Sequence, residues 1–209
     1  MENESYLRLR QMIVDRELRP GEAVSERGIS QLFGVGRMPV REAIRMLAQE
    51  GLLEVSPMRG TFVRQLTLGD LQEIHELRLA LESAAAGLAA QRGDPAGLYA
   101  IADDLRQLAE APHMDVAAAQ QLGWRFHDEM FRMTGNLRLA HLYENLRLQS
   151  GLALQGLKDY DPSRTRVAVG EHLDIIAAIT DRQADVARQK MQDHLQHAMS
   201  TRLMMLIQP

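Results

Sequence analysis

The chain has 209 residues, 45% of them hydrophobic and 25% charged, and this balance excludes a chain that is disordered throughout. It has no cysteine, which excludes disulfides, a thiolate nucleophile and a cysteine-ligated zinc site. No stretch approaches the roughly 20 apolar residues of a membrane-spanning helix, and the acidic start at residues 1–4 is unlike a secretory signal, so we expect a cytoplasmic protein with no membrane partner.

Charge is distributed unevenly along the chain. Residues 5–66 contain ten Arg, no Lys and seven acidic residues, whereas residues 67–209 carry 14 basic and 19 acidic residues. A basic front half and an acidic back half suggest two different functions. We therefore predict two domains, 1–66 and 67–209.

The basic segment shows helical spacing first and strand patterns afterwards. Its predicted elements are, in order, helices at about 6–15, 25–33 and 37–50 and strands at 52–55 and 61–64. Ser25 is the expected N-cap of the second helix, and Gly51 is expected to end the third. Helix, turn, helix and hairpin in this order predict a winged helix-turn-helix domain.

The acidic segment is helical to its end. Thr67 and Asp70 have the spacing of a capping box, with Asp in place of the usual Glu, and we expect them to start the first helix. The predicted helices end near residues 92, 110, 134, 155, 180 and 206. Together with low aromatic content, this predicts a mainly α protein whose C-terminal domain is an all-α bundle of about six helices.

The third predicted helix carries side chains suited to contacting DNA bases. Arg37, Arg41 and Arg45 recur every four residues and are expected on one outward stripe, while Ile44 and Leu47 face inward. An Arg fork can bind the O6 and N7 edge of guanine, or a phosphate. A helical unit with a hairpin can also bind proteins, so the pattern alone leaves both functions open.

Several motifs in this segment resemble the DNA-binding domain of the GntR family. They are Leu18–Glu22, Ser25–Ser30, Phe33–Ala43, Leu47–Leu53 and Arg59–Val63. The resemblance implies that six residues approach DNA: Arg27, Arg37, Met38, Arg41, Arg59 and Gly60. The chain departs from the family at Gly36, where Ser or Thr is usual, and at Met38, where Thr is usual, so the DNA sequence it binds is expected to differ from the commonest family sites.

Three histidines lie at the apolar margins of three different predicted helices: His127, His172 and His194. Neutral imidazole is a common ligand of divalent metals, and the interior of a helix bundle can bring such ligands together. A histidine on a helix is more often a surface or core residue, so spacing alone leaves the metal site open.

The acidic segment resembles the all-helical FCD ligand domain of the FadR-like branch. The matching pieces are Glu76–Glu82, Phe126-His127, Thr134–Asn136, Glu171-His172 and His194. The resemblance implies that the three histidines bind zinc, nickel or manganese, although Gly123 stands where metal-binding members have an Asp ligand. It also implies a small organic acid as effector. Arg78 is the candidate to bind that acid, and an ion pair with Glu82, four residues on, is the competing interpretation.

Together these features predict a metabolite-responsive transcriptional regulator. In the mode that is common in the family, it would repress a catabolic operon. It would bind a short palindromic site in double-stranded DNA as a homodimer. A metal-free sensor of acyl thioesters is the first alternative, and a metal-dependent helical enzyme is the second. No Gly-rich phosphate loop, His-Glu-x-x-His motif or nucleophile elbow is present in the sequence, which disfavours an enzyme.

Overall fold

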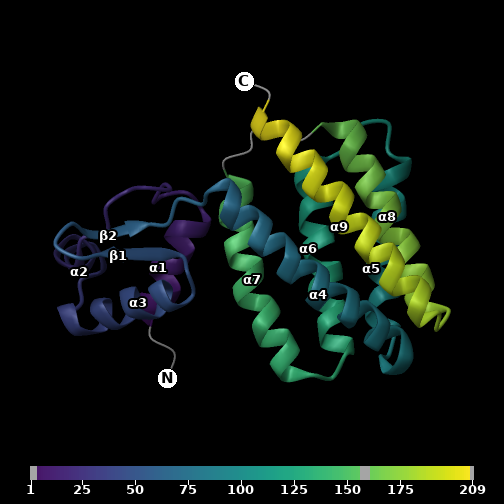
Figure 1. The fold of residues 1–209 in the computed structure, drawn as a ribbon, viewed down its shortest axis with the longest axis horizontal. Coiled ribbons are helices and arrows are strands. Elements are labelled where there is room, and N and C mark those ends of the chain that lie inside the picture. Colours follow the sequence, from purple (N-terminus) through teal and green to yellow (C-terminus); the bar gives the residue numbers. More distant parts are fainter. Residues whose placement is uncertain (1–3, 156–160, 208–209) are drawn as a thin grey trace. The chain divides into compact units, whose positions relative to one another are not determined.

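The computed structural model describes residues 4–155 and 161–207, which form nine helices and one two-stranded hairpin (Figure 1). The mainly helical fold with a small hairpin, predicted from the sequence, is confirmed. Among the described residues, no helix combines the length and the apolar composition needed to cross a bilayer.

The described residues fall into two compact units. The first contains the chain up to Gln72 together with the segment from Arg147 to the end of helix α7 (Leu137–Gln155). The second contains Glu73–Leu146 and the described residues from 161 onward. The predicted domain boundary between residues 66 and 67 falls inside the first unit and stays a prediction.

The first unit contains the helix-turn-helix and the hairpin. Its elements are α1 (Glu4–Val14), α2 (Glu26–Phe33), α3 (Arg37–Gln49), β1 (Leu53–Ser56) and β2 (Gly60–Val63). The strands pair antiparallel, with Leu53 opposite Val63 and Ser56 opposite Gly60. Each strand is displaced by one residue from its predicted range.

Local sequence signals explain where the helices of this unit start and stop. The Ser25 hydroxyl accepts a hydrogen bond from the Gly28 amide at 3.2 Å, which caps α2 as predicted. Gly34 ends α2 in the left-handed region, at φ 68°. Gly51 follows the C-cap residue of α3 with φ 72°, so the residue expected to end this helix adopts the conformation that glycine favours.

The buried face of α3 determines which side chains of this helix point outward. Val40, Ala43, Ile44 and Leu47 are buried against α1, α2 and β1. Arg37, Arg41 and Arg45 lie on the opposite face of the helix and therefore remain exposed. The amphipathic orientation predicted for this helix is confirmed.

Six helices form the rest of the described structure. They are α4 (Leu68–Arg92), α5 (Ala96–Glu110), α6 (Val116–Met133), α7, α8 (Pro162–Thr180) and α9 (Ala184–Ile207). The predicted capping box precedes α4: the Thr67 amide donates to the Asp70 carboxylate at 2.8 Å, and the Asp70 amide donates to the Thr67 hydroxyl at 3.1 Å.

The core of the second unit lies between its helices. Helix α8 packs along α9 and also contacts α5 and α6 (Figure 1). Large apolar side chains fill the space between them, among them Phe126, Met130, Ile175, Ile179, Met191 and Leu195. Polar side chains within this dry interior need partners there, because an unpaired buried polar group is costly.

Candidate functional site

The outer face of α3 is a surface of long side chains. Arg37, Met38 and Arg41 lie in its first two turns and are all exposed, Met38 to 65%. In a helix-turn-helix the first turns of the second helix meet the base edges. Within the first unit, these three side chains therefore lie on the exposed face of α3.

The other residues implied in DNA binding belong to the same unit. Arg27 lies on α2, next to its N-terminus, and is exposed. Arg59 and Gly60 are exposed at the turn between β1 and β2, where Gly60 has φ 116°. All six residues are thus accessible in the first unit, and their contact with DNA stays a prediction.

Glu26 is a residue of this surface that the sequence analysis did not single out. Its carboxylate accepts from Arg41 Nε at 3.0 Å and from Arg41 Nη2 at 3.0 Å. The two side chains come from α2 and α3, 15 residues apart in the chain. The hydrogen bond from Arg41 lowers the pKa of Glu26 below its usual value, so the pair is ionised at neutral pH.

The second unit contains a buried cluster of the three predicted histidines. His127 comes from α6, His172 from α8 and His194 from α9, and each side chain is at most 7% exposed. One nitrogen from each ring can be chosen so that all three lie within 4.8 Å of one another. The Nε2 atoms of His172 and His194 are 3.2 Å apart.

Two carboxylates contact the outer nitrogens of this cluster. Glu82 of α4 is fully buried, and its Oε2 lies 2.6 Å from His127 Nδ1. Glu171 of α8 places Oε2 2.7 Å from His194 Nδ1 and Oε1 2.6 Å from Nδ1 of the exposed His197. At His194, the carboxylate hydrogen-bonded to Nδ1 favours the tautomer whose Nε2 carries a free lone pair, the form that binds a metal.

Arg78 lies in the same interior and forms the ion pair that competed with its predicted effector role. Its Nε donates to Glu82 Oε1 at 2.5 Å, and both side chains are at most 5% exposed. The positive charge also lies close enough to lower the pKa of His172 and His194. Arg78 therefore borders the histidine cluster, and its contact with an effector stays a prediction.

Burial and charge together set the protonation of this interior. Burial by itself would raise the pKa of Glu82, but Arg78 and His127 outweigh it and hold this pKa well below its usual value. Burial, helped by the neighbouring His194, His127 and Arg78, lowers the pKa of His172 well below its usual value. We expect Glu82 to be ionised and His172 to be uncharged at neutral pH.

The cluster fits a divalent metal. Two imidazole nitrogens 3.2 Å apart can both bond to one ion at the roughly 2.0–2.1 Å that zinc takes. The third ring faces them, and its Nδ1 contacts Glu82, as histidine ligands commonly do with a carboxylate. Nδ1 of His172 is buried without a hydrogen-bond partner among the described residues, while its Nε2 faces His194.

Gly123 lies directly behind one ring of the cluster. A Cβ atom added at this position would lie 2.9 Å from His172 Cε1, closer than side-chain carbons approach one another. The position at which the FCD resemblance implies an Asp ligand therefore has no space for a side chain while His172 keeps this position. The described structure offers three histidine ligands here and no carboxylate from residue 123.

The buried histidines predict how stability depends on pH in metal-free protein. Because the fold lowers the pKa of His172 and His194, the unfolded chain binds more protons, and the fold loses stability as the pH falls below about 6.5. Urea unfolding in EDTA should give a free energy lower by about 1–3 kcal/mol at pH 5.5 than at pH 7.5. His172→Asn should reduce this difference, whereas His113→Gln, at an exposed site, should leave it unchanged.

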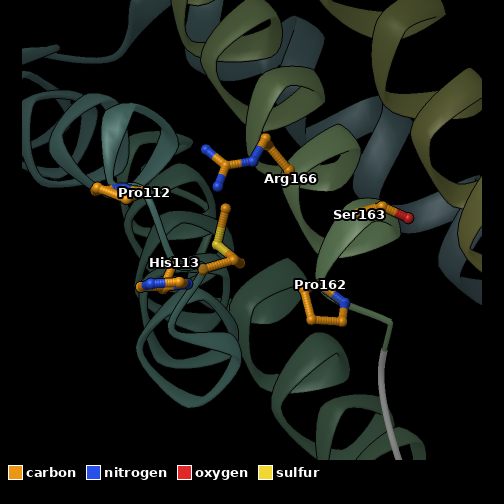
Figure 2. A pocket seen from close by; sticks show the side chains of 6 residues that line it. Pro112, His113, Pro162, Ser163 and Arg166 are labelled. Atoms are coloured by element: carbon orange, nitrogen blue, oxygen red, sulfur yellow. The ribbon is translucent and has the colours of Figure 1, made fainter.

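A separate hollow lies on the surface of the second unit, with a volume of about 410 Å³ (Figure 2). It is lined by Pro112, His113, Met114, Pro162, Ser163 and Arg166. Arg166 donates to the backbone carbonyls of Ala109 and Ala111, so its guanidinium already binds the end of α5. We assign no function to this hollow.

Two family models match successive parts of the chain. The model described as bacterial regulatory proteins, gntR family, matches residues 2–63, and the FCD domain model matches residues 73–197. The junction between them falls near the point where the sequence changes from basic to acidic.

Known proteins resemble the chain over nearly its whole length. The HTH-type transcriptional repressor RspR of Escherichia coli is 30% identical over 91% of this chain and 84% of that protein. The HTH-type transcriptional regulator YdhC of Bacillus subtilis is 28% identical over 92% of this chain and 86% of its own length. The solved structure of E. coli McbR/YncC covers 96% of both chains with a TM-score of 0.79 at 21% identity, a likeness of fold.

Proposed function

The chain belongs to the GntR family of bacterial regulatory proteins and carries an FCD domain, and from this we propose that it regulates transcription in response to a small organic acid. Residues 1–66 would bind a short palindromic DNA site, one winged helix per half-site of a homodimer. Residues 67–209 would bind the effector and form the dimer. That the protein is a transcriptional regulator follows from its family, and the remaining statements are our proposal.

One observation carries the DNA-binding part of this proposal: the exposed arginine surface of α3. Arg37 and Arg41 extend from a helix whose opposite face is buried, so the helix can enter a major groove without unfolding. Arg59, at the turn of the hairpin, is suited to reach a minor groove or a phosphate. Met38 cannot hydrogen-bond a phosphate, but its side chain suits the methyl group of a thymine.

The effector part rests on the buried histidine cluster. His127, His172 and His194 would hold a zinc, nickel or manganese ion, with Glu82 and Glu171 orienting the first and the last of these rings. A divalent ion held by three imidazoles has coordination positions left for a carboxylate oxygen. Arg78 borders the cluster. It would bind a further oxygen of the acid if the acid replaced Glu82 as the acceptor of one of its hydrogen bonds.

Two observations weigh against the alternatives. A metal-free site for an acyl thioester needs an apolar cavity, and here imidazole rings and a buried ion pair fill the interior between α4, α6, α8 and α9. A metal-dependent enzyme is disfavoured because the relatives are transcriptional regulators. The similar E. coli protein is named a repressor, which supports repression as the mode of this chain too.

The proposal is tested by binding the full chain to DNA from upstream of its own locus. We expect selective, salt-sensitive binding, measured by fluorescence anisotropy against a scrambled duplex of equal length. Adding candidate organic acids with and without Zn²⁺ should change this affinity for at least one acid. No selective binding under any of these conditions would exclude the proposed function.

Arg41→Ala should weaken binding to the upstream DNA by about 1–3 kcal/mol, the free energy of one bidentate hydrogen-bonded contact to a base. Binding to the scrambled duplex should change much less. Arg106→Ala, an exposed arginine of α5, serves as the matched control and should bind both duplexes like the unchanged protein. An equal loss on both duplexes would mean that Arg41 contacts only phosphate.

A further inference from the structure

The ion pair between Glu26 and Arg41 occupies one particular edge of the guanidinium. Arg41 has five N–H groups, and the carboxylate accepts from Nε and from one hydrogen of Nη2, at 3.0 Å each. The remaining N–H groups of Nη1 and Nη2 form the outer end of the side chain. They have no hydrogen-bond partner within the described part of the chain, and the side chain is 60% exposed.

The free end of the guanidinium matches the edge of a guanine. Two neighbouring N–H groups, one on Nη1 and one on Nη2, have the spacing that guanine O6 and N7 accept. Because the carboxylate holds the other edge, the side chain does not need to become ordered when it binds a base. Less entropy is therefore lost in forming the contact.

The carboxylate also changes what Arg41 attracts. An unpaired arginine is drawn to any phosphate, at every position along a duplex. A guanidinium paired with a carboxylate is nearly neutral as a unit, so its attraction to phosphate is largely cancelled. Its directional hydrogen bonds to a base remain, and the pair therefore favours sequence-dependent over sequence-independent contact.

Glu26 is well placed to be this partner. It is the first residue of α2, immediately after the Ser25 cap, where the helix dipole favours a negative charge. The packing of α2 on α3 through Ile29, Phe33 and Ile44 fixes the spacing of the two backbones. The core of the unit thus fixes the two backbone positions from which these exposed side chains meet.

We propose that Glu26 is a specificity-determining residue, which positions the guanidinium of Arg41 so that it recognises guanine and not phosphate. This inference rests on the proposed function, in which α3 enters the major groove. Glu26 itself acts through Arg41 and makes no contact with a base.

The experiment compares variants on DNA that the unchanged protein has selected from a pool of random duplexes. Anisotropy titrations then give the affinity for the selected duplex and for a scrambled one, and their ratio measures specificity. Glu26→Gln keeps the size of the side chain but loses its charge and one acceptor. We expect it to lower the ratio about tenfold, the scale of one base contact, by weakening selected binding and strengthening scrambled binding.

Glu42→Gln is the matched control. It removes the same charge from the same unit, and the ion pair that Glu42 forms with Arg45 is exposed and long, at 3.8 Å. It should strengthen binding to both duplexes alike and leave the ratio unchanged. A ratio that also falls about tenfold in Glu42→Gln, or one that stays unchanged in Glu26→Gln, would overturn the inference.

A double variant separates positioning from direct contact. In an Arg41→Ala background, Glu26→Gln should no longer alter the ratio, because the guanidinium that it positions is gone. A further drop would mean that Glu26 itself contacts DNA, contrary to the inference. If the unchanged protein selects no sequence from the pool, the proposed function fails and the inference fails with it.

Discussion

Glu82→Ala is expected to lower the free energy of unfolding by about 3–5 kcal/mol, the usual cost of breaking a buried ion pair. Glu82 is fully buried, and its carboxylate faces Arg78 on one side and His127 on the other. Its removal leaves the buried guanidinium without the counter-charge that Glu82 supplies. Urea unfolding of metal-free protein at pH 7.5 measures the loss.

Two further variants define the cause of this loss. Arg78→Met combined with Glu82→Leu removes both charges and should cost far less than Glu82→Ala alone, since apolar residues often replace a buried pair at little cost. Asp103→Ala breaks an exposed pair with Arg106 and should change stability by less than about 0.5 kcal/mol. A loss under about 1 kcal/mol for Glu82→Ala would contradict a buried, ionised pair.

Metal binding should produce the second large effect. A ligand that binds only the folded state stabilises it by about 4 kcal/mol when its free concentration is 1,000 times the dissociation constant. We expect Zn²⁺ to raise the unfolding free energy of EDTA-treated protein on this scale. Elemental analysis should find about one metal per chain after dialysis.

His172→Ala should remove most of this stabilisation, because two imidazoles alone bind a divalent metal weakly. His113→Ala removes an exposed imidazole outside the cluster and should retain the full effect. The metal site would be rejected if His172→Ala bound metal as tightly as the unchanged protein. It would also be rejected if the unchanged protein showed neither bound metal nor stabilisation.

The architecture could be predicted largely from local patterns. Ser25, Gly51 and the Thr67–Asp70 pair mark helix ends through contacts within a few residues, so the sequence alone was sufficient to place them. The predicted range of each strand differs by one residue from the observed range. The hairpin register depends on pairing across the turn, with Ser56 opposite Gly60. Apolar spacing also predicted correctly which face of α3 is buried.

The sites were less predictable, because they depend on how helices pack. The i,i+4 spacing offered the Arg78–Glu82 ion pair as one of two interpretations, and the structure contains it. The contact between Glu82 and His127 joins α4 to α6, and no spacing along the chain indicates it. Glu26 and Arg41 both lie in quoted motifs, yet their pairing depends on the packing of α2 against α3.

The glycine behind His172 limits how the histidine cluster can change by substitution. An acidic side chain at position 123 is a single substitution away, but its first carbon would lie 2.9 Å from Cε1 of His172 on α8. The ring would have to move before the new oxygen could lie beside the other two histidines, so a carboxylate at position 123 requires a displaced His172 ring. Descendants of this chain are therefore expected to adjust the surroundings of His172 before, or together with, residue 123.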